Sequence, residues 1–199
     1  MPGSSAVSGV LLAAGSSERF DDDMPKQLLP VEGEPLVRRT ARRALASRLA
    51  EVIVVVGHQA RQVSAALRGL PVRIVENPAF QTGQASSVRV GLEAVDSSST
   101  ASLFMPADQP NLDSWVIDAL IGLFESTGGP IVVPTFEGVR AAPVLFARSL
   151  FDELQGLVGD IGGRQLFPRH ADGIVELPLA DTGPLADLDT QEDRKKLGL

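Results

Sequence analysis

The chain has 199 residues, a formal net charge of −7 and no cysteine. Its 44% hydrophobic and 22% charged content fit one globular domain that buries a core. The acidic balance argues against a nucleic-acid-binding protein, whose affinity rests on a basic surface. The missing cysteines exclude disulfides, thiolate metal sites and a cysteine nucleophile.

Residues 1–6 carry neither a basic nor a long apolar segment. We therefore expect a flexible terminus there, followed by one domain over residues 7–199. We also expect no signal peptide and a cytoplasmic location. No apolar run reaches the length of about 18 residues that a membrane span needs, so we expect no membrane partner.

The first predicted element is a buried strand over residues 7–13, which leads into a loop of small residues. Residues 14–17 have little side-chain bulk, so their backbone N–H groups can approach a ligand closely. Such a loop at the carboxyl end of a strand can form an anion-binding nest. Arg19 and Lys26 are the cations that can neutralise the bound charge. The sequence therefore predicts a phosphate-rich ligand at this loop. The acidic run 21–23 in the same loop is interpreted as a solvated loop tip.

Strands and helices alternate through the rest of the chain. We expect a first helix to start at 33–35, and further helices over 59–68, 84–95, 112–126, 148–157 and 163–169. We expect strands over 51–57, 72–76, 101–105, 130–135, 143–147 and 173–178. This alternation favours an α/β sheet with parallel neighbours. In the helices, we expect Trp115 in the core and the arginines of the first helix (Arg38, Arg39, Arg42 and Arg43) on a solvated face.

Polar residues lie close to the predicted ends of two strands. His58 follows the strand over 51–57, at the end where ligands of α/β proteins often bind. A loop histidine that forms structural hydrogen bonds is the favoured interpretation. Ser86 and Ser87 lie near the start of the helix over 84–95, where they either cap that helix or bond a nucleotide base.

Three aspartates are candidates for a cation site. Asp108 follows the strand over 101–105 and lies in a turn that is fixed by prolines on either side. This carboxylate either binds a divalent cation or caps the next helix. Asp187 and Asp189 are two residues apart on an extended segment, so their side chains point the same way.

Five blocks of the sequence resemble the nucleotidyltransferase superfamily, and most closely the molybdenum cofactor cytidylyltransferases of the MobA-like NTP transferase group. The first block is Leu12-Ala13-Ala14-Gly15-Ser16-Ser17-Glu18-Arg19-Phe20…Lys26. The others are 77–88, 106–110, 159–164 and 187–193, in the family's order. The resemblance implies a single-domain three-layer α/β/α sandwich with a mostly parallel, Rossmann-like (GT-A-like) sheet.

The resemblance also implies a reaction, in which CTP (or another NTP) donates CMP to a phosphorylated molybdopterin-type cofactor and pyrophosphate is released. Arg19 and Lys26 would hold phosphates, and Asp108 would bind Mg²⁺ with Asp189 or Asp187 as second ligand. The implied nucleotide contacts are Leu12, Ala13, Ala14, Gly15, Ser16, Asn77, Gly83, Gln84 and Ser87. The implied acceptor contacts are Asp160, Gly162 and Arg164.

The sequence departs from the family's pattern at three points. Residues 21–25 lengthen the segment before Lys26, Phe20 replaces the commoner methionine, and Ala141 stands where a glycine is usual. The added methyl group at Ala141 would narrow the acceptor site.

Three other functions remain open. One is transfer to a sugar or alcohol phosphate. Another is a non-catalytic nucleotide- or cofactor-binding protein that delivers cofactor to a molybdenum hydroxylase, with the molybdoenzyme or its chaperone as partner. The third is a nicotinamide-dependent oxidoreductase, against which the missing Gly-x-Gly-x-x-Gly pattern counts.

Overall fold

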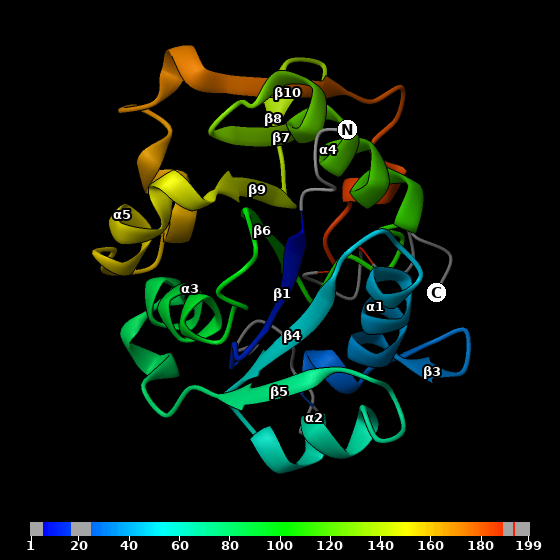
Figure 1. Cartoon of the computed structure of the whole chain (residues 1–199). Helices are drawn as coiled ribbons and strands as arrows, with labels where there is room; N and C mark the ends of the chain where they lie inside the picture. The colour runs from blue at the N-terminus through cyan, green and yellow to red at the C-terminus, as the bar shows by residue number, and fades with distance from the viewer. Residues whose placement is uncertain (1–5, 17–24, 189–192, 194–199) are drawn as a thin grey trace.

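The structure is a computed structural model that describes residues 6–16, 25–188 and 193 (Figure 1). Arg19 and Asp189, two of the predicted site residues, lie outside the described residues, as does the acidic run 21–23. The domain boundary expected between residues 6 and 7 stays a prediction.

One mixed sheet forms the centre of the described chain, with strand order β10-β7-β9-β6-β1-β4-β5 and β8 paired with β7. The strands are β1 (Val7–Ala13), β4 (Glu51–Val56), β5 (Arg73–Glu76), β6 (Ala101–Pro106), β7 (Ile131–Phe136), β8 (Val139–Arg140), β9 (Val144–Ala147) and β10 (Ile174–Pro178). The two central neighbours of β1 are parallel to it, whereas β9 runs antiparallel to both of its neighbours. A separate ribbon joins β2 (Pro30–Val31) to β3 (Glu34–Pro35).

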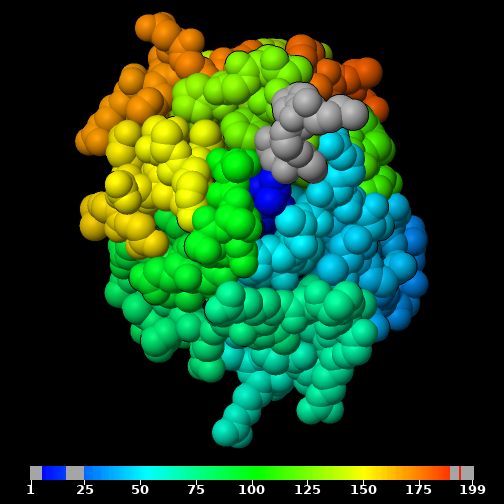
Figure 2. Space-filling model, viewed as in Figure 1, coloured from blue at the N-terminus to red at the C-terminus, as the bar shows by residue number. Residues whose placement is uncertain are grey.

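Helices cover both faces of this sheet and produce the expected three layers (Figure 1). The helices α1 (Leu36–Leu45), α2 (Ala60–Ala66) and α4 (Ser114–Thr127) pack on one face. The helices α3 (Gln84–Glu93) and α5 (Phe151–Gln155) pack on the other. Figure 2 shows the blue start of the described chain as a small patch at the middle of this face, between green and cyan segments. No helix of the described chain is both long and apolar enough to cross a membrane.

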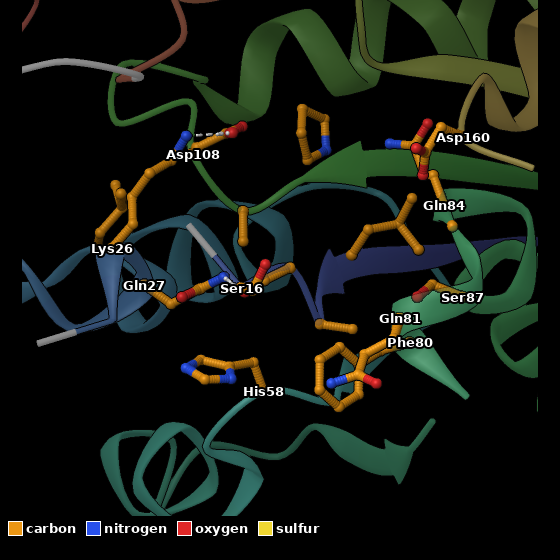
Figure 3. Close-up of a pocket in the computed structure, with 17 residues that line it drawn as sticks. Ser16, Lys26, Gln27, His58, Phe80, Gln81, Gln84, Ser87, Asp108 and Asp160 are labelled. Atoms are coloured by element: carbon orange, nitrogen blue, oxygen red, sulfur yellow. Dashed lines mark hydrogen bonds and ion pairs between the residues drawn. The ribbon is translucent and has the colours of Figure 1, made fainter. Parts of the chain in front are cut away.

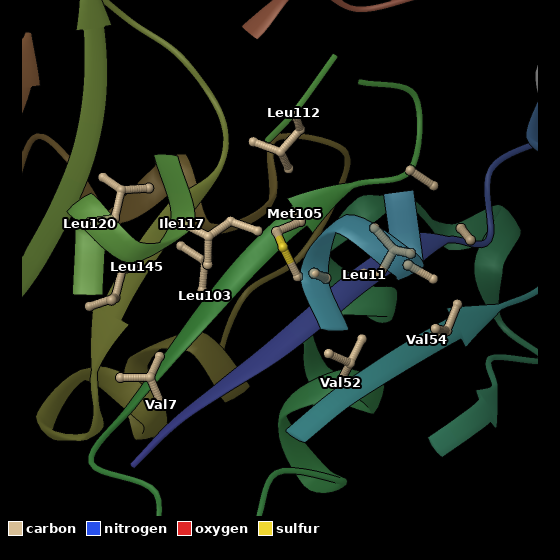
Figure 4. Close-up of a cluster of buried hydrophobic side chains, with 14 of the residues drawn as sticks. Val7, Leu11, Val52, Val54, Leu103, Met105, Leu112, Ile117, Leu120 and Leu145 are labelled. Atoms are coloured by element: carbon tan, nitrogen blue, oxygen red, sulfur yellow. The ribbon is translucent and has the colours of Figure 1, made fainter. Parts of the chain in front are cut away.

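The central strands are apolar throughout because both of their faces are buried. Successive side chains of a strand point to opposite faces, so Val10 packs against the α3 layer and Leu11 against the α1 layer. Figure 4 shows the α1 side, where Leu11 and Met105 from the sheet lie in one cluster with Ile117 of α4. This packing confirms the predicted α/β sandwich.

Two expectations about side-chain burial are wrong. Trp115 is 53% exposed, because the buried stripe of α4 starts one residue later. That stripe consists of Val116, Ile117, Leu120, Ile121 and Phe124. Arg39 is buried rather than solvated: its Nε donates to Pro110 O at 2.9 Å and its Nη1 pairs with Glu32 at 2.7 Å.

The predicted helix over 163–169 is also wrong, because this segment forms only a short 3₁₀ turn, η4 (Gly162–Leu166). Two glycines at the start of the segment disfavour a regular helix. A Cβ on Gly163 would lie 2.7 Å from Phe146 Cζ, so the turn passes directly over the sheet's aromatic side chains. The sequence also gave no sign of the two-residue strand β8.

The contact of α3 with the sheet leads to a prediction about stability. A Cβ on Gly91 would lie 2.4 Å from Val10 Cγ1 and 3.1 Å from Val55 Cγ2. We expect Gly91→Ala to lower the free energy of unfolding by about 1 to 3 kcal/mol in urea denaturation, because overpacking outweighs the better helix propensity of alanine. Gly122→Ala in α4 is the matched control, since a Cβ there meets nothing within 4 Å. That control should raise the free energy of unfolding by up to about 1 kcal/mol, and equal effects of the two changes would contradict the packing argument.

Candidate active site

The site lies at the carboxyl ends of β1 and β6, which are neighbours in the sheet. Leu12 of β1 is in register with Pro106 of β6, and Ala107 N donates to Leu12 O at 3.1 Å. The strand order switches here, because β4 and β5 extend the sheet on one side of β1 and β6 starts the other side. Such a switch point is where ligands of open α/β sheets bind.

A cavity of about 850 Å³ opens at this switch point (Figure 3). Residues from the ends of β1, β4 and β6, from η1 (Lys26–Leu28) and from the turn before α3 line it. The lining residues are Leu12, Ala14, Gly15, Ser16, Lys26, Gln27, Leu36, His58, Phe80, Gln81, Gly83, Gln84, Ser87, Pro106, Ala107, Asp108 and Asp160. The volume is in the range of small-molecule and cofactor sites.

Most of the residues that the resemblance assigned to the nucleotide line this cavity, but two do not. Ala13 is 1% exposed and packs in the core on the α1 side of the sheet. Asn77 is also 1% exposed and lies behind the cavity wall. Any contact of these two residues with a ligand would be indirect or through the backbone.

The small-residue loop is held by two backbone-directed hydrogen bonds. Gln27 Nε2 donates to Gly15 O at 2.9 Å, and His58 N donates to Ala14 O at 3.1 Å. In each bond the acceptor is a backbone carbonyl oxygen of the loop. The two bonds therefore hold the loop in place directly after the carboxyl end of β1. Gln27 was not predicted as a site residue, although it directly follows Lys26, which was.

Asn77 orients the two serines at the start of α3. Its Nδ2 donates to Ser86 Oγ at 2.8 Å and to Ser87 Oγ at 3.0 Å. Ser86 in turn donates to Gly83 O, whereas Ser87 faces the cavity. Because Ser87 Oγ accepts from Asn77, the hydroxyl can donate its own hydrogen to another acceptor. Of the two alternatives that the sequence left open for these serines, the structure does not show capping, since Gly83 occupies the N-cap position and α3 has no side-chain cap.

An aromatic pair forms one wall of the cavity. The rings of His58 and Phe80 meet edge to face with their centroids 6.0 Å apart (Figure 3). A Cβ on Gly57 would lie 2.8 Å from Phe80 Cβ and 2.9 Å from Ala14 Cβ, so a glycine is needed for this close approach. His58 therefore lies at the ligand cavity, while Phe80 and Gln81 carried no signal in their turn-rich segment.

Lys26 and Asp108 meet at the opposite side of the cavity from this wall (Figure 3). Lys26 Nζ lies 2.8 Å from Asp108 Oδ2, with 10% of the lysine side chain and 29% of the aspartate side chain exposed. The other carboxylate oxygen, Oδ1, is buried and has no hydrogen-bond partner among the described residues. A buried acceptor without a donor fits a cation ligand.

No cluster of three or more histidines or acidic residues is present in the described ranges. A cation at Asp108 would therefore take few ligands from these residues. Mg²⁺ suits such a site, since it usually keeps several waters and binds one or two carboxylates together with substrate phosphates.

A second cavity of about 350 Å³ adjoins the first and shares Leu12, Gln84, Pro106, Asp108 and Asp160 with it. Its other lining residues are Val88, Phe104, Ala142, Val144, Phe146, Ile161, Gly163, Arg164 and Asp187. Two of the predicted acceptor contacts, Asp160 and Arg164, thus line it, and Gly162 does not. Ala142, not Ala141, lines this cavity, so the extra methyl group expected to narrow it lies outside the lining.

The turns that serve the two cavities are in direct backbone contact. Ala85 N donates to Gly159 O at 3.0 Å. A Cβ on Gly83, whose φ is +109°, would lie 2.5 Å from Gly159 O. The turn before α3 and the glycine-rich turn 159–163 are therefore in contact, and Gln84 and Asp160 next to this contact line both cavities.

Comparison with known proteins identifies the family. Residues 9–174 match the MobA-like NTP transferase domain. The chain belongs to this family. It is thus a nucleotidyltransferase by family, which confirms the predicted resemblance to the MobA-like NTP transferase group.

Two relatives and one solved structure are similar over nearly the whole chain. The purine catabolism protein PucB of Bacillus subtilis is 32% identical over 93% of this chain and 92% of its own. The nicotine blue oxidoreductase of Paenarthrobacter nicotinovorans is 30% identical over 96% of each chain. The crystal structure of Rv0371c from Mycobacterium tuberculosis has a TM-score of 0.85 at 31% identity, covering 98% of this chain and 100% of that one. A further structure of Rv0371c is a complex with manganese.

The Lys26–Asp108 pair predicts an unusual response of this MobA-like protein to mutation. An ammonium group 2.8 Å from the candidate ligand competes with a divalent cation. We expect Lys26→Gln to bind Mn²⁺ alone about tenfold more tightly than the wild type, because that competition is removed. The same change should weaken the binding of a nucleotide such as CTP, because a cation that lines the larger cavity is lost.

Titration by electron paramagnetic resonance measures the Mn²⁺ affinity, and calorimetry measures the CTP affinity. Arg43→Gln is the control, since it removes an arginine that pairs with Asp113 at 2.9 Å and lines neither cavity. An unchanged Mn²⁺ affinity in Lys26→Gln would show that the lysine does not compete for the site.

Proposed function

We propose that this protein transfers CMP from CTP to a phosphorylated pterin cofactor of the molybdopterin type, with release of pyrophosphate. The observation that carries the proposal is that two adjoining cavities have Asp108 in both of their linings. A phosphate donor in the larger cavity and a phosphate acceptor in the smaller one would bring their reacting groups together at that carboxylate.

The larger cavity has the features that a nucleoside triphosphate requires. The loop of Ala14, Gly15 and Ser16 supplies close-approaching backbone groups, and Lys26 supplies a cation. Ser87 offers a hydrogen-bond donor, and the His58–Phe80 pair offers an apolar surface for a base. Arg19, which lies outside the described residues, is proposed as a second phosphate ligand.

The lining of the smaller cavity combines apolar side chains with charged ones, and we propose a fused-ring phosphate as its acceptor. Val88, Phe104, Val144 and Phe146 line it with apolar surface, and the two phenylalanine rings meet edge to face at 6.0 Å. A sugar's hydroxyl groups would lose hydrogen bonds to water against such a surface, whereas a fused ring would bury apolar area there. Arg164 lines the same cavity and can pair with a phosphate in bidentate fashion.

The proposed reaction is an in-line displacement. An oxygen of the acceptor phosphate forms a bond to the α-phosphorus of CTP, and the bond from that phosphorus to the bridging oxygen breaks, so that pyrophosphate leaves. The chain orients the two substrates and neutralises charge, and it needs no covalent intermediate. Mg²⁺ would be held by Asp108 with Asp187 or Asp189, and it supplies charge stabilisation to the phosphates when bound.

The test combines the protein with CTP, MgCl₂ and molybdopterin cofactor and follows pyrophosphate release. We expect turnover with CTP, and a rate lower by about 100-fold or more in Asp108→Asn, since loss of the cation ligand removes several kcal/mol of charge stabilisation. Release with GTP or with a sugar phosphate, but not with CTP and the pterin, would refute the assigned substrates.

Two controls in the same experiment test the other functions. NADH and NADPH are included because one relative carries the name of an oxidoreductase, and oxidation of either one would favour that activity. If Asp108→Asn keeps full function in delivering cofactor to a molybdoenzyme, the protein acts as a non-catalytic accessory protein. The cytoplasmic location expected from the sequence stays a prediction.

A further inference from the structure

Gln109 follows the candidate cation ligand Asp108 and lines neither cavity. It is 1% exposed, in a segment between Pro106 and Pro110. Its Nε2 has hydrogen-bond partners in the fold, whereas its buried Oε1 has none among the described residues. An unpaired buried polar group is costly, so the bonds of Nε2 are what hold the side chain in this orientation. Those partners show what the residue does.

Both protons of the Gln109 amide bond to distant backbone carbonyls. Nε2 donates to Ala142 O at 3.2 Å and to Leu185 O at 3.1 Å. Both partners are acceptors, so the nitrogen, and not Oε1, must face them. One side chain thus joins the Asp108 turn to a wall of the smaller cavity and to the C-terminal segment.

The C-terminal segment is held on both sides of Asp187. Leu185 O accepts from Gln109, and Leu188 N donates to Asp108 O at 2.8 Å. Leu188 is also 1% exposed and packs in a small cluster with Leu29, Val31 and Leu36. Asp187 lies between these two anchors and lines the same cavity as Asp108.

We infer that Gln109 is a positioning residue, which places the carboxylate of Asp187 beside that of Asp108 as the second ligand of the cation site. The Asp108–Gln109 dipeptide acts as a template, since it bonds the segment on each side of Asp187. This inference rests on the proposed function, because it requires a divalent cation at Asp108. It names Asp187 as the second ligand, one of the two aspartates that the sequence left open.

The experiment measures the affinity of the full chain for Mn²⁺ alone, by electron paramagnetic resonance and without substrates. Gln109→Met keeps the length of the side chain and removes both donors. We expect its Mn²⁺ affinity to fall about tenfold, as for outer-shell partners of metal ligands. The matched control is Gln155→Met, whose amide donates to Arg89 O at 3.5 Å and lines neither cavity.

A double-mutant cycle separates positioning from general destabilisation. If Gln109 acts through Asp187, then Gln109→Met combined with Asp187→Asn binds Mn²⁺ as weakly as Asp187→Asn alone. Additive losses, or a wild-type affinity in Asp187→Asn, would overturn the inference. Circular dichroism melting checks the fold, and Gln109→Glu, which sets carboxylate oxygens against two carbonyls, provides a second variant with the same expected loss.

The variant Asp108→Asn distinguishes a failure of the inference about Gln109 from a failure of the proposed function. If it abolishes Mn²⁺ binding while Gln109→Met does not change it, the inference fails and the proposed function stands. If Asp108→Asn leaves Mn²⁺ affinity unchanged, no cation site exists at Asp108, and the proposed metal-dependent reaction fails together with the inference.

Discussion

The parallel pairing of β1 with β6 is the constraint on which the site depends. It sets Leu12 opposite Pro106, so the phosphate loop and the Asp108 turn leave the sheet at one edge although they are more than 90 residues apart in the chain. The pairing itself is stabilised by core on both faces, from Val10 on one side and Leu11 on the other. A slip in the register of β1 against β6 would move the Asp108 carboxylate relative to the loop that follows β1. The buried core that holds this register therefore determines the geometry of the site as well as the fold.

A chain with a net charge of −7 can hold a triphosphate only if positive charge is concentrated at the site. Lys26 lines the larger cavity and is paired with Asp108, so these two partly buried groups compensate each other's charge. Burying either charge alone would be costly. When a nucleotide and a divalent cation bind, the phosphates would pair with Lys26 and the cation would pair with Asp108. The Lys26–Asp108 ion pair could then break without leaving either charge unpaired.

The sequence allowed the layers and most strands to be predicted, because apolar runs such as residues 51–57 are long and uninterrupted. Prediction from the sequence was less reliable where contacts between distant segments determine the burial of a side chain. Arg39 is buried because Glu32 and Pro110 O meet its guanidinium, and these partners come from a ribbon and a turn that helical periodicity does not reveal. At the site, the motif residues were found, but His58 and Phe80 were not assigned to it, since only the fold brings their segments together.

The most informative residues for the site are those that touch neither cavity. Asn77 and Gln109 are both 1% exposed, and each uses its amide to fix groups that do face ligand. Asn77 directs the hydroxyl of Ser87, and Gln109 holds the backbone around Asp187. Both lie in sequence blocks that carry the resemblance to the family. From the sequence alone, a polar residue in such a block that contacts the ligand cannot be told from one that only holds a neighbouring residue in place. The structure separates the two roles, because a side chain that is fully enclosed can act on a substrate only through the residue that it holds.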